Sequence, residues 1–122
     1  MGKIRPAEFD ERSAREDVFV LDIRPRKNYR DGHISGSHNV PVYDDLRGGD
    51  ASALRSHLDE IPKDREVVTV CKAGVVARRA TSALQEDGYE ATTLAGGMRG
   101  WRGYENNSLG YRAMSLLWRV LP

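Results

Sequence analysis

The chain has 122 residues and a formal net charge of +1; 39% of its residues are hydrophobic and 30% are charged. This length suits one domain with its own core and is too short for two ordinary domains, and the composition excludes extended disorder. The balanced charge does not indicate nucleic-acid binding, and no apolar run approaches the roughly 18 residues that a membrane-spanning helix needs.

The first half of the chain alternates predicted helices with predicted strands. Pro6 to Arg12 predicts a helix, since proline at an early position lacks only an amide that would have no helical partner. A buried strand is predicted over Asp17 to Asp22, and a turn with a short helix over Arg24 to Asp31. Gly32 to Pro41 is rich in glycine, serine and histidine, which indicates a loop around a short strand at His38 to Val40.

The second half continues this alternation. Asp50 to Leu58 predicts a helix capped by its first residue, and the β-branched run Val67 to Val70 predicts a strand buried on both faces. Ala77 to Asp87 predicts a helix and Ala91 to Leu94 a further strand. Strands at helix-length intervals predict an α/β fold with a mostly parallel central sheet and helices on both faces.

Residues 105–122 differ from the domain expected over residues 1–104. After a polar break at Glu105 to Ser108, the clearly polar side chains of the tail are few and fall at helical spacing: Arg112, Ser115 and Arg119. A helix with this pattern has one broad apolar face, which must be covered. We expect it to pack on its own domain or in a homodimer through residues 109–121; a partner groove or a membrane surface is the alternative.

The only cysteine, Cys71, opens the loop between the Val67 strand and the Ala77 helix. It cannot form an internal disulfide, and the amino terminus lacks the apolar core of a secretion signal, so we expect a cytoplasmic protein. Ligands of α/β sheets gather at such strand ends, where the amides of the following helix point at an anion. A thiolate is such an anion. Cys71 is therefore a candidate nucleophile, and a buried, inert cysteine is the alternative.

The residues after Cys71 suit a thiolate. Gly74 permits the backbone angles that curl successive amides into an anion-binding nest, and Lys72 would add positive charge if its side chain turned inward. The three histidines, His33, His38 and His57, lack the spacing of metal ligands. We expect neither a metal nor another cofactor.

Four motifs in the same order resemble landmarks of the rhodanese sulfurtransferases. They are LDIRP at Leu21–Pro25, GHISGSHNVP at Gly32–Pro41, CKAGVVA at Cys71–Ala77 and GGMRGW at Gly96–Trp101. The resemblance covers about residues 5–104 and implies a single rhodanese-like α/β domain. It also implies that a Cys71 persulfide carries sulfane sulfur from a thiosulfate-type donor to cyanide, a thiol or a sulfur-acceptor protein.

The same resemblance implies the roles of individual residues. Cys71 would be catalytic, Asp22 would tie down loops, and substrate binding would fall to Lys72, Ala73, Gly74, Val75, Val76, Ala77 and Arg24. Ala73 and Val76 stand where many relatives have polar or basic side chains, which predicts a more apolar pocket. Asn28 replaces an acidic residue of the family, so a carboxylate partner for Arg24 at that point is not expected.

Two other functions are consistent with parts of the sequence. Related phosphatases and arsenate reductases carry an oxyanion-binding arginine six positions after the cysteine, where this chain has Ala77, so we do not expect their chemistry. The main alternative is a non-catalytic interaction module that acts through the carboxyl-terminal helix.

Overall fold

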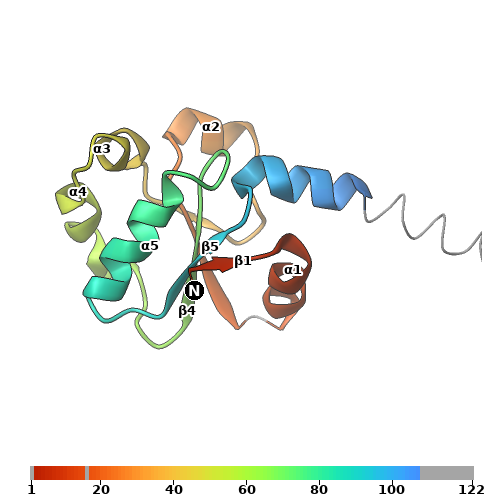
Figure 1. Cartoon of the computed structure of the whole chain (residues 1–122), viewed down its shortest axis with the longest axis horizontal. Coiled ribbons are helices and arrows are strands. Elements are labelled where there is room, and N and C mark those ends of the chain that lie inside the picture. Colours follow the sequence, from red (N-terminus) through yellow and green to blue (C-terminus); the bar gives the residue numbers. More distant parts are fainter. Residues whose placement is uncertain (1, 16, 108–122) are drawn as a thin grey trace, which may run out of the picture.

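The computed structural model describes residues 2–15 and 17–107. Five strands form one sheet in the order β1-β5-β4-β2-β3, and every neighbouring pair is parallel (Figure 1). The strands are β1 (Lys3–Ile4), β2 (Val18–Asp22), β3 (His38–Asn39), β4 (Glu66–Val70) and β5 (Ala91–Leu94). The predicted α/β fold with a parallel sheet is confirmed.

Helices connect the strands, as parallel pairing requires. They are α1 (Pro6–Ala14), α2 (Arg26–Asp31), α3 (Tyr43–Arg47), α4 (Ser52–Arg55), the 3₁₀ helix η1 (Leu58–Glu60) and α5 (Ala77–Glu86). Residues 97–107 are also helical. A polar break was predicted at Glu105 to Ser108. That prediction is wrong for residues 105–107, which continue the helical segment. The predicted apolar helix over Leu109 to Pro122, and the dimer contact through it, lie outside the described residues.

The predicted helix over Asp50 to Leu58 is divided in the structure. Its middle forms α4, and its end belongs to η1. The Asp50 carboxylate accepts a hydrogen bond from the Ser52 amide over 2.9 Å, so it caps the first turn from two residues away. β1 and α3 were not expected, because elements of two and five residues leave no periodic pattern in a sequence.

Strand side chains alternate between two cores, one on each face of the sheet. Val67 and Cys71 pack with residues of α3, α4 and α5, whereas Val68 and Val70 pack with Phe9 of α1 and with the start of the segment 97–107. Figure 1 shows α3, α4 and α5 on one side of the sheet and α1 with the segment 97–107 on the other. Two covered faces explain why the strands are continuously apolar in the sequence.

The parallel register brings two loops to one edge of the sheet. Asp22 at the end of β2 is paired with Val70 at the end of β4, and the Ile23 amide donates to the Val70 carbonyl oxygen over 2.9 Å. The residues after Asp22 and the residues after Val70 therefore leave the sheet side by side. No helix within residues 2–15 and 17–107 combines the length and apolar character that crossing a bilayer needs.

Candidate active site

Cys71 lies directly after β4, at the start of the loop 71–76 that leads into α5. Two backbone amides point at its sulfur: the Gly74 N–H donates to Sγ over 3.1 Å and the Ala77 N–H over 3.4 Å. The residue is only 1% exposed. Donors aimed at a sulfur atom stabilise negative charge on it, so this geometry suits a thiolate or a persulfide anion.

Glycine is required at the two points where this loop meets residues 95–100. Gly74 has a φ of +84°, and a Cβ at that position would lie 2.9 Å from the Gly96 nitrogen. Gly97 has a φ of +58°, and a Cβ there would collide with the carbonyl oxygen of Cys71. Residues with side chains rarely adopt such angles, and here they would also lack space.

Backbone hydrogen bonds fasten the cysteine loop to the start of the segment 97–107. The Met98 amide donates to the Cys71 carbonyl oxygen over 2.8 Å, and the Arg99 amide donates to the Lys72 carbonyl oxygen over 3.0 Å. The sequence predicts no individual site role for Gly97, Met98 or Arg99. The signal that could have found them is the pair of glycines at positions 96 and 97, one residue after β5, because paired glycines mark a close approach of two backbones.

Lys72 is held at the rim of the loop by an aromatic ring. Its side chain is exposed, and its Nζ lies 5.0 Å from the ring centroid of Tyr43, the first residue of α3. This distance is within the range of a cation–π interaction, which places a positive charge beside the loop. Sequence reasoning missed Tyr43, because only the fold brings α3 next to the residue after the nucleophile.

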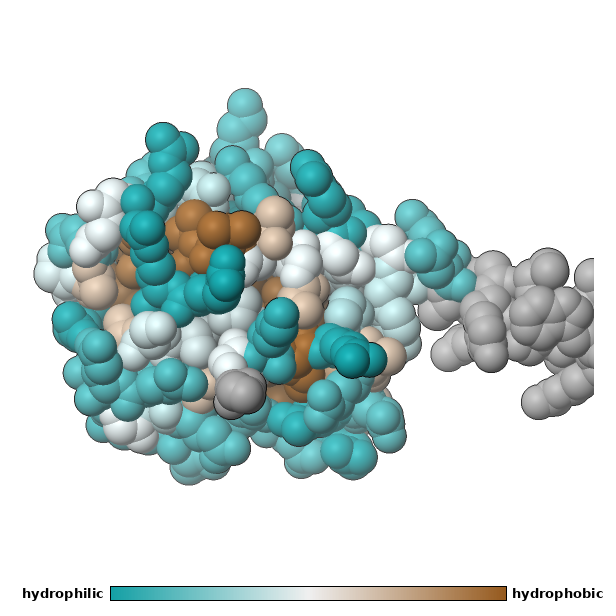
Figure 2. All heavy atoms as spheres, viewed as in Figure 1, coloured by the Kyte–Doolittle hydropathy of each residue, from teal (hydrophilic) through white to brown (hydrophobic). Residues whose placement is uncertain are grey.

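The apolar side chains of the loop divide between the surface and the core. Ala73 and Val75 are exposed, with Val75 at 60%, whereas Val76 and Ala77 are buried in the core beside α5. The Val76 side chain packs into the core, so the exposed apolar side chain of this loop is that of Val75. A role of Val76 in substrate binding stays a prediction. The face shown in Figure 2 is mainly hydrophilic, with apolar surface in separate patches.

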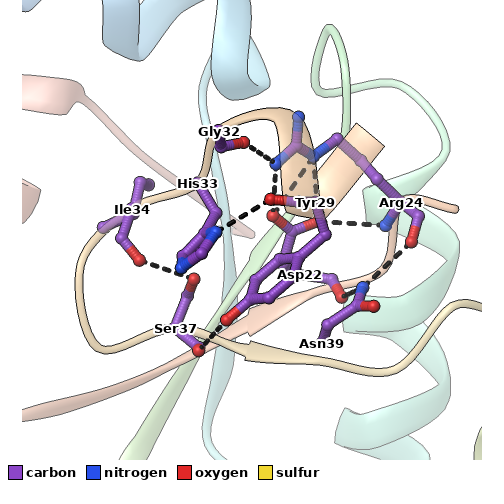
Figure 3. A network of polar contacts seen from close by, with 8 residues as sticks. All are labelled: Asp22, Arg24, Tyr29, Gly32, His33, Ile34, Ser37 and Asn39. Carbon is purple, nitrogen blue, oxygen red and sulfur yellow. Dashed lines mark hydrogen bonds and ion pairs between the residues drawn. The ribbon is translucent and has the colours of Figure 1, made fainter. Parts of the chain in front are cut away.

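A buried ion pair joins Arg24 to Asp22 at the end of β2 (Figure 3). Asp22 Oδ2 accepts from Arg24 Nη2 over 2.8 Å, and Asp22 Oδ1 accepts from both Nε and the backbone amide of Arg24 over 3.0 Å. Their side chains are 1% and 4% exposed. The carboxylate partner of Arg24 is therefore Asp22, two residues earlier, and not position 28. A role of Arg24 in substrate binding stays a prediction.

The loop after α2 is closed by the same network (Figure 3). Arg24 Nη2 also donates to the Gly32 carbonyl oxygen over 2.7 Å, and the Asn39 amide group donates to the Asp22 and Arg24 carbonyl oxygens over 2.9 and 3.0 Å. The Tyr29 hydroxyl donates to the Ser37 carbonyl oxygen over 2.6 Å. These hydrogen bonds, made by residues of the motif GHISGSHNVP at Gly32–Pro41, hold β3 and the loop before it against β2.

The three histidines make ordinary contacts. His33 stacks on the Tyr29 ring with a centroid distance of 3.8 Å, and His38 Nε2 and His57 Nδ1 lie 2.7 and 2.5 Å from the two carboxylate oxygens of Glu60. Within the ranges 2–15 and 17–107, no group of three or more histidine, cysteine, aspartate or glutamate residues could hold a metal ion.

Comparisons with known proteins agree with this fold. A family model described as a rhodanese-like domain matches residues 5–104. A "Sulfurtransferase" of Allochromatium vinosum is 31% identical over 87 residues, which are 70% of this chain and 73% of that protein. A solved structure of a rhodanese-related protein from Thermoplasma volcanium has a TM-score of 0.71 at 23% identity and covers 84% of this chain and 92% of its own. The resemblance inferred from the four motifs is confirmed.

Similar domains also occur in proteins of other kinds. The "HTH-type transcriptional regulator Rv0324" of Mycobacterium tuberculosis is 32% identical over 101 residues, which are 81% of this chain and 41% of the regulator. This chain spans less than two thirds of the length of several curated relatives that it matches.

Proposed function

Since this chain belongs to the rhodanese-like domain family, we propose that it is a sulfurtransferase that carries sulfane sulfur as a persulfide on Cys71. The observation that carries the proposal is the pair of amides, from Gly74 and Ala77, that point at the cysteine sulfur. A buried, inert cysteine would need no donors on its sulfur. A sulfur that bears a negative charge before and after the reaction does need them.

With a thiosulfate-type donor, the first step is a displacement at sulfur. The Cys71 thiolate forms a bond to the outer sulfur of thiosulfate, and the sulfur–sulfur bond of thiosulfate breaks with its electron pair leaving on sulfite. The products are the Cys71 persulfide anion and sulfite, so atoms and charge balance without an oxidant. No general base is required, because the nucleophile and the leaving group are both anions.

The rim of the loop supports an anionic donor. The ammonium group of Lys72, which lies over the Tyr43 ring, supplies a positive charge that attracts the sulfonate group of the donor. The exposed side chains of Val75 and Ala73 make the neighbouring surface of the loop apolar. A thiol, cyanide or a sulfur-acceptor protein then removes the sulfur. A single cysteine without a disulfide partner is consistent with action in the reducing cytoplasm.

Intact-mass measurement after incubation with thiosulfate, without reductant, tests the proposal. We expect a gain of one sulfur atom that is lost on addition of cyanide and is absent in Cys71→Ser. Because Cys71 is the only cysteine, the gain can be assigned to one atom. No gain with thiosulfate or with other sulfane donors would refute the sulfurtransferase proposal and favour the non-catalytic interaction module.

A further inference from the structure

A positively charged hollow opens beside the cysteine loop. It has a volume of about 420 Å³, and its lining includes Arg24, Asn28, Asp31, Lys72, Arg99 and Arg102. These residues come from three parts of the chain: the segment after β2, the cysteine loop and the helical segment 97–107. The fold therefore brings cations from distant positions to one place at the carboxyl edge of the sheet.

Backbone contacts tie this hollow to the nucleophile. Met98 also lines the hollow, and its backbone amide donates a hydrogen bond to the Cys71 carbonyl oxygen. The backbone amide of Arg99 donates to the Lys72 carbonyl oxygen. The hollow therefore shares Lys72 with the cysteine loop and contacts the backbone of Cys71 through Met98. These two hydrogen bonds also fix the position of the hollow relative to the cysteine loop.

The charge of the hollow is positive after internal pairing. Arg24 is neutralised by Asp22, and the remaining lining has three cations against one carboxylate, Asp31, a formal excess of two positive charges. Within residues 2–15 and 17–107, no carboxylate is paired with Arg99 or Arg102. Both are exposed and are free to bind an external anion.

Two guanidinium groups converge on Gly32. Arg24 Nη2 donates to the Gly32 carbonyl oxygen over 2.7 Å, and Arg102 Nη2 lies 3.4 Å from the position that a Cβ of residue 32 would take. A Cβ at position 32 would therefore contact the Arg102 guanidinium. Guanidinium groups present planar, forked donors that match a carboxylate.

We propose that this hollow binds the carboxylate of the thiol that accepts sulfur from Cys71, an inference that rests on the proposed sulfurtransferase function. The volume leaves room for an acceptor thiol larger than the five heavy atoms of thiosulfate, since ligand sites span about 300 to 1,000 Å³. In this step the sulfur of the thiol R–SH bonds to the outer sulfur of the Cys71 persulfide anion. The persulfide bond breaks, and the products are R–S–SH and the Cys71 thiolate.

The test compares 3-mercaptopropionate with its neutral amide, 3-mercaptopropionamide, as acceptors for the thiosulfate-loaded protein. We expect the double variant Arg99→Gln/Arg102→Gln to lower the ratio of kcat/KM for the anionic over the neutral acceptor by roughly tenfold or more, since hydrogen bonds to charged groups contribute about 1.5–3 kcal/mol. Arg15→Gln is a control for the loss of an exposed cation. It removes one exposed cation between α1 and β2, at the opposite edge of the sheet, and should leave the ratio unchanged.

Separate measurement of persulfide formation distinguishes the outcomes. An unchanged acceptor ratio in the double variant would overturn the proposal, whether or not persulfide formation slows; a slower formation with an unchanged ratio would assign the hollow to the donor. Circular dichroism and thermal unfolding of each variant identify a folding defect, which would lower both acceptor rates equally. If the wild-type protein forms no persulfide, the sulfurtransferase proposal fails at that earlier step, and this one with it.

Discussion

The Thr69 hydroxyl donates a hydrogen bond to the carbonyl oxygen of Ala77 over 3.1 Å, and the amide of the same Ala77 donates to Cys71 Sγ over 3.4 Å. Thr69 Oγ1 also lies 2.8 Å from Thr81 Oγ1, which lies 2.7 Å from Thr93 Oγ1. All three hydroxyl groups are buried. This chain of hydroxyls joins β4, α5 and β5, and it holds the first residue of α5 where its amide meets the reactive sulfur.

Replacing Thr69 with valine should therefore reduce the reactivity of Cys71. Valine has a similar shape but cannot bond to Ala77, so we expect alkylation of Cys71 by iodoacetamide at neutral pH to slow roughly fivefold, the equivalent of one net hydrogen bond of about 1 kcal/mol. Thr69→Ser keeps the hydroxyl and should react at close to the wild-type rate. Equal alkylation rates for the valine and serine variants would show that the contact with Ala77 does not position the amide.

Gly97→Ala should disrupt the site from outside the cysteine loop. The added Cβ would collide with the Cys71 carbonyl oxygen and lie 2.8 Å from the nitrogens of Ala73 and Gly74, at a φ of +58°. Strain of this kind costs about 1–3 kcal/mol or more, so we expect a lower unfolding free energy in urea and a loss of persulfide formation.

The matched control for this change is Gly103→Ala, in the same helical segment. A Cβ at Gly103 would meet no atom within 4 Å, and alanine is favoured over glycine in a helix by up to about 1 kcal/mol. This variant should be as stable as the wild type or more so. If both alanine variants behaved alike, the close approach at residue 97 would not limit the fold or the site.

The buried pair of Asp22 and Arg24 should be far more important for stability than an exposed pair. Asp22→Asn leaves the guanidinium without its countercharge at 4% exposure, and breaking a buried pair in this way costs about 3–5 kcal/mol. Asp17→Asn removes the partner of Arg15 in a pair exposed by about 60%, where losses stay below about 1 kcal/mol. Urea unfolding of the two variants measures the difference, and similar losses would contradict the assignment of Asp22 as the anchor of this edge.

Glu60 should make stability depend on pH. Hydrogen bonds from His57 and then His38 lower the pKa of Glu60 below its ordinary value of 4.5. The folded state therefore binds a proton at this carboxylate less readily than the unfolded state does. The contribution of Glu60 to stability is present above the unfolded pKa and is lost as the pH falls through the lower, folded pKa.

The measurement is the urea midpoint of the wild type and of Glu60→Gln at pH 6 and at about pH 3, on either side of the ordinary carboxylate range. We expect the wild type to be the more stable at pH 6 and the difference to shrink at the lower pH. Asp59→Asn removes the neighbouring carboxylate and controls for the change in net charge. A difference between the wild type and Glu60→Gln that stays the same at both pH values would argue against a role of the two histidines.

The sequence predicted the longer elements well because their signals are local. The β-branched run before Cys71 is β4, the helix from Ala77 ends one residue before the predicted end at Asp87, and β5 has the predicted bounds Ala91–Leu94. β1 was missed because its two residues become a strand only by pairing with β5. The helix expected from Asp50 was predicted too long, since the chain leaves the helical path after Arg55.

By itself the sequence determined the order of the elements, the place of the single cysteine at the end of a buried strand and the four motifs of the family. These depend on residue types and short spacings along the chain. Tertiary structure alone decided which groups surround that cysteine: Tyr43 beside Lys72, the backbone at Gly97 against the loop, and Arg102 over Gly32. The physical reason is that such contacts join residues far apart in the chain, whose distance is set by strand register and helix packing and leaves no local pattern to detect.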